Sequence, residues 1–246
     1  MAWRIFAASA KGSSHVAAGL PCQDASAFAR HGEWLIAVVC DGAGSAASSH
    51  IGSSRISHAT VQVLTARGEL LASADHADIE KLVTDVLTET REALAEHARI
   101  ARTELSAYAA TVVGVVMGPE HGWFFHVGDG IGVARHDDGI TLSLPENGEY
   151  ANETFFLTGH DWLAHLRISP IEKPARSVLL MSDGAMPFVM ARGNQALFAP
   201  FVEPVERYLA QADEATGSQA LAATLDDPRT HGITSDDKTL LIALGD

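Results

Sequence analysis

The stretch Val38-Val39-Cys40-Asp41-Gly42-Ala43-Gly44 carries an acidic residue out of an apolar run and directly into a glycine-rich turn. Residues 35–40 form an unbroken apolar run rich in β-branched side chains, which predicts a strand covered on both faces. Gly42 and Gly44 allow a tight turn with positive φ and leave a carbonyl group exposed beside Asp41. The small residues at 45–49 predict the start of a helix. Asp41 is therefore expected at the edge of a sheet.

An aspartate followed by glycine is also the commonest signal for a hairpin turn, and the chain contains such a case. Asp138 and Gly139 lie between the short apolar runs 133–135 and 140–142, which predicts an ordinary hairpin. Asp41 differs because a helix start, and not a second strand, follows it. Asp41 is therefore a candidate functional residue, and Asp138 is not.

Three further acids lie at the ends of predicted strands. Asp129 and Asp183 each follow a buried apolar run, while Asp236 precedes one. Antiparallel neighbours would bring these acids and Asp41 to one edge of a sheet assembly. Burying several carboxylates together is costly unless cations compensate their charge. Oxygen-only ligands suit Mg²⁺ or Mn²⁺ and do not suit zinc, so the pattern predicts a site for such ions.

The remaining pattern predicts strands alternating with a few helices in a single domain that spans residues 1–246. An amphipathic helix is expected over residues 75–105, with nothing catalytic on it. The segment 11–25 is expected to be a loop, because its proline and glycines disfavour a helix. Further strands are predicted at 3–10, 25–29, 109–117, 122–127, 154–157, 177–181 and 239–244, and further helices at 45–66 and 200–223.

Composition excludes several classes of partner. The chain has 246 residues, 47% of them hydrophobic and 20% charged, with a formal net charge of −14. This charge disfavours binding to nucleic acid or to an anionic membrane. The sequence has neither an 18-residue apolar run nor the pattern of a signal peptide, so a cytoplasmic protein is expected. Cys22 and Cys40 have no metal-binding or disulfide-framework spacing.

The strand-end acids occur in short motifs whose order and spacing resemble those of a known family. The chain is similar to the metal-dependent (PPM, type 2C) serine/threonine protein phosphatases, and its opening motifs resemble the compact bacterial branch of that family. The similarity covers nearly the whole chain. The motifs are Gly12-x-Ser14-His15, Pro21-Cys22-Gln23-Asp24-Ala25, Asp41-Gly-x-Gly, Gly128-Asp129, Ser182-Asp183-Gly184 and Asp236-Asp237-Lys238-Thr239.

This resemblance implies a fold and a reaction. The fold is a four-layer α-β-β-α sandwich, in which two antiparallel sheets are flanked by helices. The reaction is hydrolysis of phosphoserine and phosphothreonine in proteins, with water activated by two Mn²⁺ or Mg²⁺ ions and a third, looser ion position. A serine/threonine kinase acting on the same proteins is a candidate partner, which the chain itself does not identify.

The resemblance also assigns roles to individual residues. Asp41 corresponds to the aspartate that bridges both ions, and the Gly42 carbonyl to a ligand of one of them. Asp183 and Asp236 complete the first ion's ligands. In addition, Asp24 corresponds to the acid beside the second ion and Asp129 to the acid at the third position. Asp237 corresponds to a residue that lies next to the ion ligands without binding an ion directly.

Three departures from the family pattern leave alternatives open. Gln23 replaces a common glutamate, which predicts weaker binding of the second ion. No arginine matches the family's usual phosphate-binding residue, and His15 is the nearest candidate for that role. Ala43 replaces a histidine that acts as general acid in many eukaryotic members. A catalytically impaired binding module is therefore one alternative function, and a dinucleotide-binding protein with the fingerprint Gly42-x-Gly44-x-x-Ala47 is a remote one.

Overall fold

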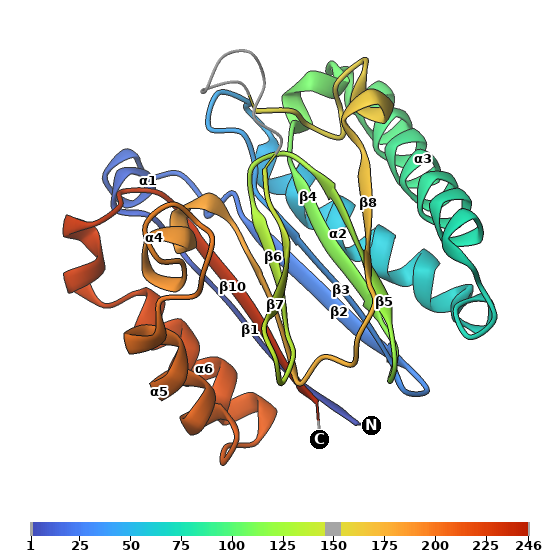
Figure 1. Ribbon diagram of the computed structural model, residues 1–246. Helices are drawn as coiled ribbons and strands as arrows, with labels where there is room; N and C mark the ends of the chain where they lie inside the picture. Colours follow the sequence, from blue (N-terminus) through green and yellow to red (C-terminus); the bar gives the residue numbers. More distant parts are fainter. Residues whose placement is uncertain (1, 146–153, 246) are drawn as a thin grey trace.

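The computed structural model describes residues 2–145 and 154–245, which form two five-stranded antiparallel sheets packed face to face (Figure 1). The predicted α+β sandwich is confirmed. The first sheet has the order β1 (Trp3–Ala10), β10 (Lys238–Gly245), β9 (Ser177–Met181), β6 (Ile131–Arg135) and β7 (Ile140–Ser143). The second has the order β2 (Ala25–His31), β3 (Trp34–Cys40), β4 (Val112–Met117), β5 (Gly122–Val127) and β8 (Arg167–Ile171).

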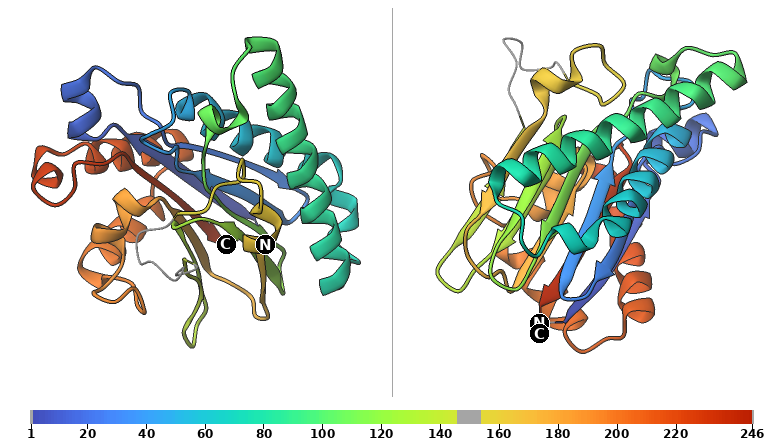
Figure 2. Two further views of the ribbon diagram at one scale, coloured as in Figure 1. Left: turned by 90° about the horizontal axis from the view of Figure 1, so that it is seen from above. Right: turned by 90° about the vertical axis from the view of Figure 1, so that its right-hand side faces the viewer.

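Helices cover the outer face of each sheet, which gives the expected four layers (Figure 2). On the second sheet lie α2 (Ser49–Ala66) and α3 (His76–Ala101); on the first lie α4 (Met186–Val189), α5 (Ala199–Leu209) and α6 (Glu214–Leu225). The short helix α1 (Ser13–Ala18) buries no residue. Single 3₁₀ turns occur at Gly68–Leu70, Leu105–Tyr108, Trp162–His165, Asp183–Ala185 and Pro228–Gly232.

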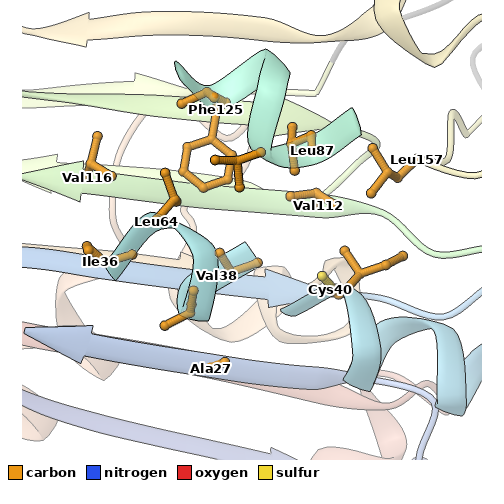
Figure 3. Close-up of a cluster of buried hydrophobic side chains, with 14 of the residues drawn as sticks. Ala27, Ile36, Val38, Cys40, Leu64, Leu87, Val112, Val116, Phe125 and Leu157 are labelled. Carbon is orange, nitrogen blue, oxygen red and sulfur yellow. The ribbon is translucent and has the colours of Figure 1, made fainter. Parts of the chain in front are cut away.

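The position of strand β3 explains why its sequence is apolar without interruption. Leu35, Ala37 and Val39 point between the two sheets, where they join the central core. The alternate residues Ile36, Val38 and Cys40 point outward and pack under α2 and α3 (Figure 3). Because the strand is covered on both faces, its side chains are apolar at every position rather than at every second one.

The strand register places the functional loops at one end of the sandwich. In each sheet the strands run antiparallel, so the end of one strand lies beside the start of the next. Consequently the acids that follow β3, β5 and β9 and those that precede β2 and β10 all lie at the same end. The pairs that define this end are Ala10 with Lys238, Ala25 with Cys40, Val112 with Val127 and Ile131 with Met181.

Two helix predictions near the N-terminal half need correction. The helix predicted from residue 45 begins only at Ser49, because the preceding residues form turns. The predicted loop at 11–25 contains α1, whose Ser14 amide donates to the Ser235 carbonyl oxygen. Gly19, with φ at 68°, ends this helix. A contact with a residue far along the chain is not visible in a local pattern.

The remaining corrections concern element ends. The amphipathic helix ends at Ala101, because Arg102 adopts a left-handed conformation. The predicted helix 200–223 is two helices, and the second begins where Asp213 accepts a hydrogen bond from the Thr216 amide. No strand forms at residues 154–157. The sequence also predicts a polar loop at residues 145–152, and residues 146–152 of it lie outside the described part of the chain.

Within residues 2–145 and 154–245, none of the helices combines the length and the apolar character that crossing a membrane requires.

Candidate active site

The strand-end acids surround a cavity of about 220 Å³ at the end of the sandwich described above. Among the described residues four carboxylate side chains line it, and no lysine, arginine or histidine does. The lining residues come from both sheets, so the cavity exists only because the sheets are packed together. They are Gln23, Asp41, Gly42, Ala43, Gly44, Ser45, Thr111, Asp129, Thr154, Phe156, Asp183 and Asp236.

The turn after β3 holds Asp41 through the start of β4. The Asp41 amide donates to Thr111 Oγ1 over 3.0 Å, and the Thr111 amide donates to the Asp41 carbonyl oxygen over 2.8 Å. Gly42 pairs with Ala110 in an isolated bridge. Neither Gly42 nor Gly44 has the positive φ that the sequence suggested. Gly42 is instead required for space, since an ideal Cβ there would lie 2.6 Å from the Gln23 carbonyl oxygen.

Asp183 and Asp236 come from neighbouring strands of the first sheet. Asp183 begins the 3₁₀ turn after β9, and Asp236 immediately precedes Asp237 and β10. The two loops approach closely, because an ideal Cβ on Gly184 would lie only 1.9 Å from the Asp237 carbonyl oxygen. Asp183 Oδ1 is buried and has no hydrogen-bond partner among the described residues.

Asp129 lies on the connection between β5 and β6, which passes from one sheet to the other. Its Oδ2 accepts a hydrogen bond of 2.7 Å from Thr154 Oγ1. Gly128 before it has a φ of 117°, which an L side chain adopts only with strain. The turn thus places Asp129 in the cavity lining together with Asp41 and Asp183.

Gln23 and Asp24 differ in their access to the cavity. Gln23 lines it, and Gln23 Oε1 is buried without a hydrogen-bond partner among the described residues. Asp24 is only 7% exposed and lies behind the lining, where its Oδ2 accepts a hydrogen bond of 2.7 Å from Ser182 Oγ. Asp24 Oδ1 is likewise unpartnered. The structure therefore does not bring Asp24 into the cavity with the other four aspartates.

His15 and Asp237 do not line the cavity, and they contact each other behind it. His15 Nδ1 lies 2.9 Å from Asp237 Oδ2, which also accepts a hydrogen bond of 2.5 Å from the Gln23 amide. Asp237 Oδ1 accepts from the Gly12 amide over 2.6 Å. Asp236 and Asp237 thus point to opposite sides of an extended chain, as adjacent residues do. No contact of His15 with the cavity is present.

Burial and mutual repulsion raise the carboxyl pKa values of this cluster. Burial, followed by the charges of Asp24 and Asp183, raises the pKa of Asp41 well above its ordinary value. Burial raises the pKa of Asp24 to about 7, and burial together with Asp129 and Asp236 raises that of Asp183. Bound cations would relieve this repulsion and favour the ionised carboxylates.

The donor set fits hard divalent cations. Within residues 2–145 and 154–245, the acids that line the cavity have no basic partner there. In the same part of the chain, the buried oxygens Gln23 Oε1 and Asp183 Oδ1 find no hydrogen-bond partner. Oxygen donors of this kind suit Mg²⁺ and Mn²⁺. Among the described residues no three acidic, histidine or cysteine side chains converge as a complete ligand set. Cation binding is therefore expected to draw the repelling carboxylates inward.

The cysteines near this end of the sandwich are not suited to nucleophilic catalysis. Burial, and then the charges of Asp24 and Asp237, raise the pKa of Cys22 to about 12. Burial likewise raises the pKa of Cys40 well above its ordinary value. Both thiols are therefore protonated at neutral pH, and the thiolate is the reactive form.

A larger groove of about 640 Å³ lies between α3 and the segment that connects α2 to it, but it has different chemistry. Four of its charged residues form ion pairs, Arg67 with Glu89 and Lys81 with Asp85. Asp78 is a further lining acid, so the groove presents paired charges and one separate carboxylate rather than the cluster of four carboxylates that marks the first cavity.

Sequence reasoning missed three lining or supporting residues. Thr111 holds the backbone of Asp41, Thr154 donates to Asp129, and Ser182 Oγ connects Asp24 to the Thr239 amide, which donates to it over 2.9 Å. Ser182 belongs to a motif that the sequence did single out. Thr111 and Thr154 carry no local signal, because isolated threonines at loop ends are common.

Comparisons with known proteins agree with one another. The family model described as Protein phosphatase 2C matches residues 11–226. Serine/threonine-protein phosphatase 3 of Escherichia coli (strain K12) is 30% identical over 253 residues, which cover 99% of each chain. PppA, a regulatory component of the T6SS in Pseudomonas aeruginosa, is 18% identical, with a TM-score of 0.66 over 99% of this chain and 98% of its own. The catalytic domain of the serine/threonine protein phosphatase PstP, solved with two manganese ions, is 18% identical, with a TM-score of 0.62 over 98% and 97%.

Proposed function

The chain belongs to the protein phosphatase 2C family of serine/threonine phosphatases, and from this membership we propose that its cavity hydrolyses phosphoserine and phosphothreonine in proteins with Mn²⁺ or Mg²⁺. One observation carries the site assignment. Four carboxylates from loops of both sheets converge on a cavity without basic side chains, and the pKa values of Asp41 and Asp183 are raised there.

We propose that Asp41, Asp183 and Asp236, with the Gly42 carbonyl, hold the tightly bound ions. Asp129 serves a looser position, and Gln23 contributes its amide oxygen in place of a carboxylate. Asp24 acts from behind this set, where Ser182 orients its carboxylate. When bound, the cations supply charge neutralisation of the phosphoryl oxygens and activation of a water molecule.

The chain's own residues determine what else the reaction requires. No thiol near the cavity is ionised, so attack by a water molecule is favoured over a covalent intermediate. Among the described residues no basic side chain lines the cavity, which leaves recognition of the phosphate dianion to the ions and to the backbone amides of Gly42, Gly44 and Ser45. The Ala43 amide already donates to the Ala109 carbonyl oxygen. Ala43 has no ionisable group, so the leaving serine or threonine oxygen receives its proton from solvent.

We further propose that residues 1–246 act as one catalytic domain and that a serine/threonine kinase modifies the same substrates. The two sheets share one central core, and the cavity needs loops from both, which favours a single unit. The fold speaks against the dinucleotide-binding alternative. Strand β3 pairs antiparallel with β2 and β4, whereas that fingerprint requires a parallel strand and crossover helix.

The test is hydrolysis of a phosphoserine peptide with and without Mn²⁺. We expect activity with Mn²⁺ or Mg²⁺ and none in excess chelator. Asp41→Asn and Asp183→Asn should each lower kcat by at least about a hundredfold, because each removes one charge from the cation site. Removing a repelling charge should leave the metal-free fold at least as stable.

Asp138→Asn is the matched control, because Asp138 lies in a hairpin turn and pairs with the exposed Lys173. It should retain wild-type activity. Undiminished hydrolysis in chelator would refute the proposed mechanism. Mn²⁺ binding without hydrolysis of any phosphopeptide would favour the alternative of an impaired binding module.

A further inference from the structure

One wall of the cavity is made by a segment that belongs to no regular element. Thr154 and Phe156 line the cavity, yet residues 154–159 form neither helix nor strand. The segment has few backbone hydrogen bonds of its own. The Leu157 amide donates to the Ala110 carbonyl oxygen over 3.0 Å, and the Gly159 amide donates to that of Phe156 over 2.9 Å. Its position must therefore depend on other contacts.

Some of those contacts come from Phe155, whose ring stacks on that of His165, and from the buried Leu157. Others come from α3, which lies beside this part of the chain (yellow in Figure 1). Arg91 of α3 is half-buried, and its Nε donates to the Leu157 carbonyl oxygen over 3.1 Å. Its Nη2 donates to the carbonyl oxygens of Thr158 and Gly159 over 3.4 and 3.3 Å. One guanidinium group thus binds three consecutive carbonyl groups directly after the cavity wall.

The same segment reaches the acid cluster through Thr154. Its hydroxyl donates to Asp129 Oδ2 over 2.7 Å. Asp129 lies on the β5–β6 connection, and the hydroxyl of Thr154 is the side-chain group that orients its carboxylate. A continuous set of contacts therefore runs from α3 through the wall to a residue of the cavity.

We propose that Arg91 is a positioning residue for the active site, which fixes the Thr154 hydroxyl against Asp129 and thereby strengthens cation binding at that carboxylate. This inference rests on the proposed function and adds a residue of an outer helix to it. A guanidinium group is suited to hold three carbonyl groups, because hydrogen bonds from a charged donor are stronger than neutral ones and its planar set of N–H groups can donate to several acceptors at once. A lysine in its place presents a single nitrogen at the end of a flexible stem.

The experiment measures Mn²⁺ binding by isothermal titration calorimetry, with thermal unfolding in parallel. Thr154→Val removes the hydroxyl and should weaken the weakest Mn²⁺ binding step about tenfold, as loss of an outer-shell partner does. Arg91→Gln leaves the hydroxyl in place but frees the segment, so a smaller loss of about threefold to tenfold is expected. Arg91→Lys should recover part of it.

Arg99→Gln is the matched control, because Arg99 lies on the same helix, is exposed and pairs only with Glu96 in the described structure. It should bind Mn²⁺ as the wild type does. The double variant Arg91→Gln/Thr154→Val tests the route of the effect. If Arg91 acts through Thr154, the double variant should bind Mn²⁺ no more weakly than Thr154→Val alone.

The outcomes separate this inference from the proposed function. Unchanged Mn²⁺ affinity in Arg91→Gln, or additive losses in the double variant, would overturn the role of Arg91 while leaving the proposed function intact. A lower melting temperature with unchanged affinity would likewise show that Arg91 serves stability alone. Absence of Mn²⁺ binding by the wild-type protein would overturn both. If Arg91→Gln does not fold, Arg91→Lys and Thr154→Val still decide the matter.

Discussion

Gln23 presents a neutral oxygen to a cavity that is otherwise lined by carboxylates. Its Oε1 is buried and unpartnered among the described residues, and its backbone is held from two sides. The Gln23 amide donates to Asp237, and Ser53 Oγ donates to the Gln23 carbonyl oxygen over 2.5 Å. The backbone at this position is therefore fixed and the side chain is buried, so a change in its charge should act directly on the cations.

Gln23→Glu is expected to lower the Mn²⁺ concentration for half-maximal activity by about tenfold, or ~1.4 kcal/mol, because charge count governs affinity for hard cations. At saturating Mn²⁺ the rates should be similar. Metal titrations of activity measure the effect. Gln62→Glu, on the exposed side of α2, changes the net charge equally and serves as control. An unchanged or greater Mn²⁺ requirement in Gln23→Glu would place Gln23 away from the cations.

At the scale of single residues, strand-end position was the informative signal. Asp41, Asp129, Asp183 and Asp236 all follow or precede buried strands, and the structure gathers them in one cavity. Thr111 and Thr154 could not be found this way, because their partners are distant in sequence. The hydrogen bond between Thr154 and Asp129 depends on a loop conformation that no local pattern encodes.

At the scale of elements, the close contact of α2 with the turn before β4 is critical. Gly52 of α2 lies against Tyr108, and an ideal Cβ on Gly52 would lie 2.0 Å from the Tyr108 carbonyl oxygen. The Ser48 amide donates to the Ala107 carbonyl oxygen over 2.8 Å, which ties the start of the helix to the same turn. This turn leads into Thr111, so the helix supports the residue that holds Asp41.

Gly52→Ala is expected to lower the free energy of unfolding by about 1–3 kcal/mol, since backbone must shift to admit the methyl group. Alanine favours a helix by about 1 kcal/mol over glycine, but this gain should not compensate for the clash. Urea unfolding measures the difference. Gly232→Ala is the control, because no atom lies within 4 Å of its ideal Cβ. A Gly52→Ala protein as stable as the wild type would show that the contact can relax freely.

Strands were predictable more accurately than helices because their apolar runs are short and continuous. β1, β5 and β9 begin and end where the sequence indicates. The helices begin and end elsewhere, because their ends depend on capping and tertiary contacts. The side chain of Asp213 caps the start of α6 and so separates it from α5. The apolar pattern of α3 continues to Leu105 although the helix has ended, because Leu105 packs against the same core.

At the scale of the whole molecule, the acid cluster should govern how stability depends on pH. The pKa of Asp24 is raised to about 7, and those of Asp41 and Asp183 are also raised. Between the ordinary aspartate pKa and these values, the folded metal-free protein binds protons that the unfolded chain does not. Its stability should therefore fall as pH rises through this window. Burial lowers the pKa of His126 to about 3. Below about pH 6.5 the unfolded chain therefore binds a proton on this histidine that the folded protein does not, which offsets at most one of the protons that the aspartates contribute.

We expect the metal-free protein to resist urea better at about pH 5 than at about pH 7.5, and saturating Mn²⁺ to reverse this order, because cations favour the ionised carboxylates. Urea midpoints in chelator and in Mn²⁺ at both pH values test this. Asp41→Asn should flatten the pH dependence in chelator. Metal-free stability that rises from pH 5 to pH 7.5 would mean that the acids are less buried than the structure places them.

The overall topology was predictable only through the family resemblance. Alternating apolar strands and an amphipathic helix are compatible with several sandwich folds. What the pattern could not show is that β5 and β6 lie in different sheets, although three residues connect them. That change of sheet places Asp129 in the same cavity as Asp41.

Because the acids come from both sheets, a bound cation also acts as a reversible cross-link between segments far apart in the sequence. At the opposite end of the sandwich, apolar side chains and the hydrogen bond from Arg30 Nε to the Trp3 carbonyl oxygen hold the sheets together, whereas at this end bare carboxylates repel one another. Release of the cations is then expected to favour unfolding from this end. The lifetime of the folded enzyme would be set by how slowly its ions dissociate, so kinetic stability and catalytic competence would be lost together.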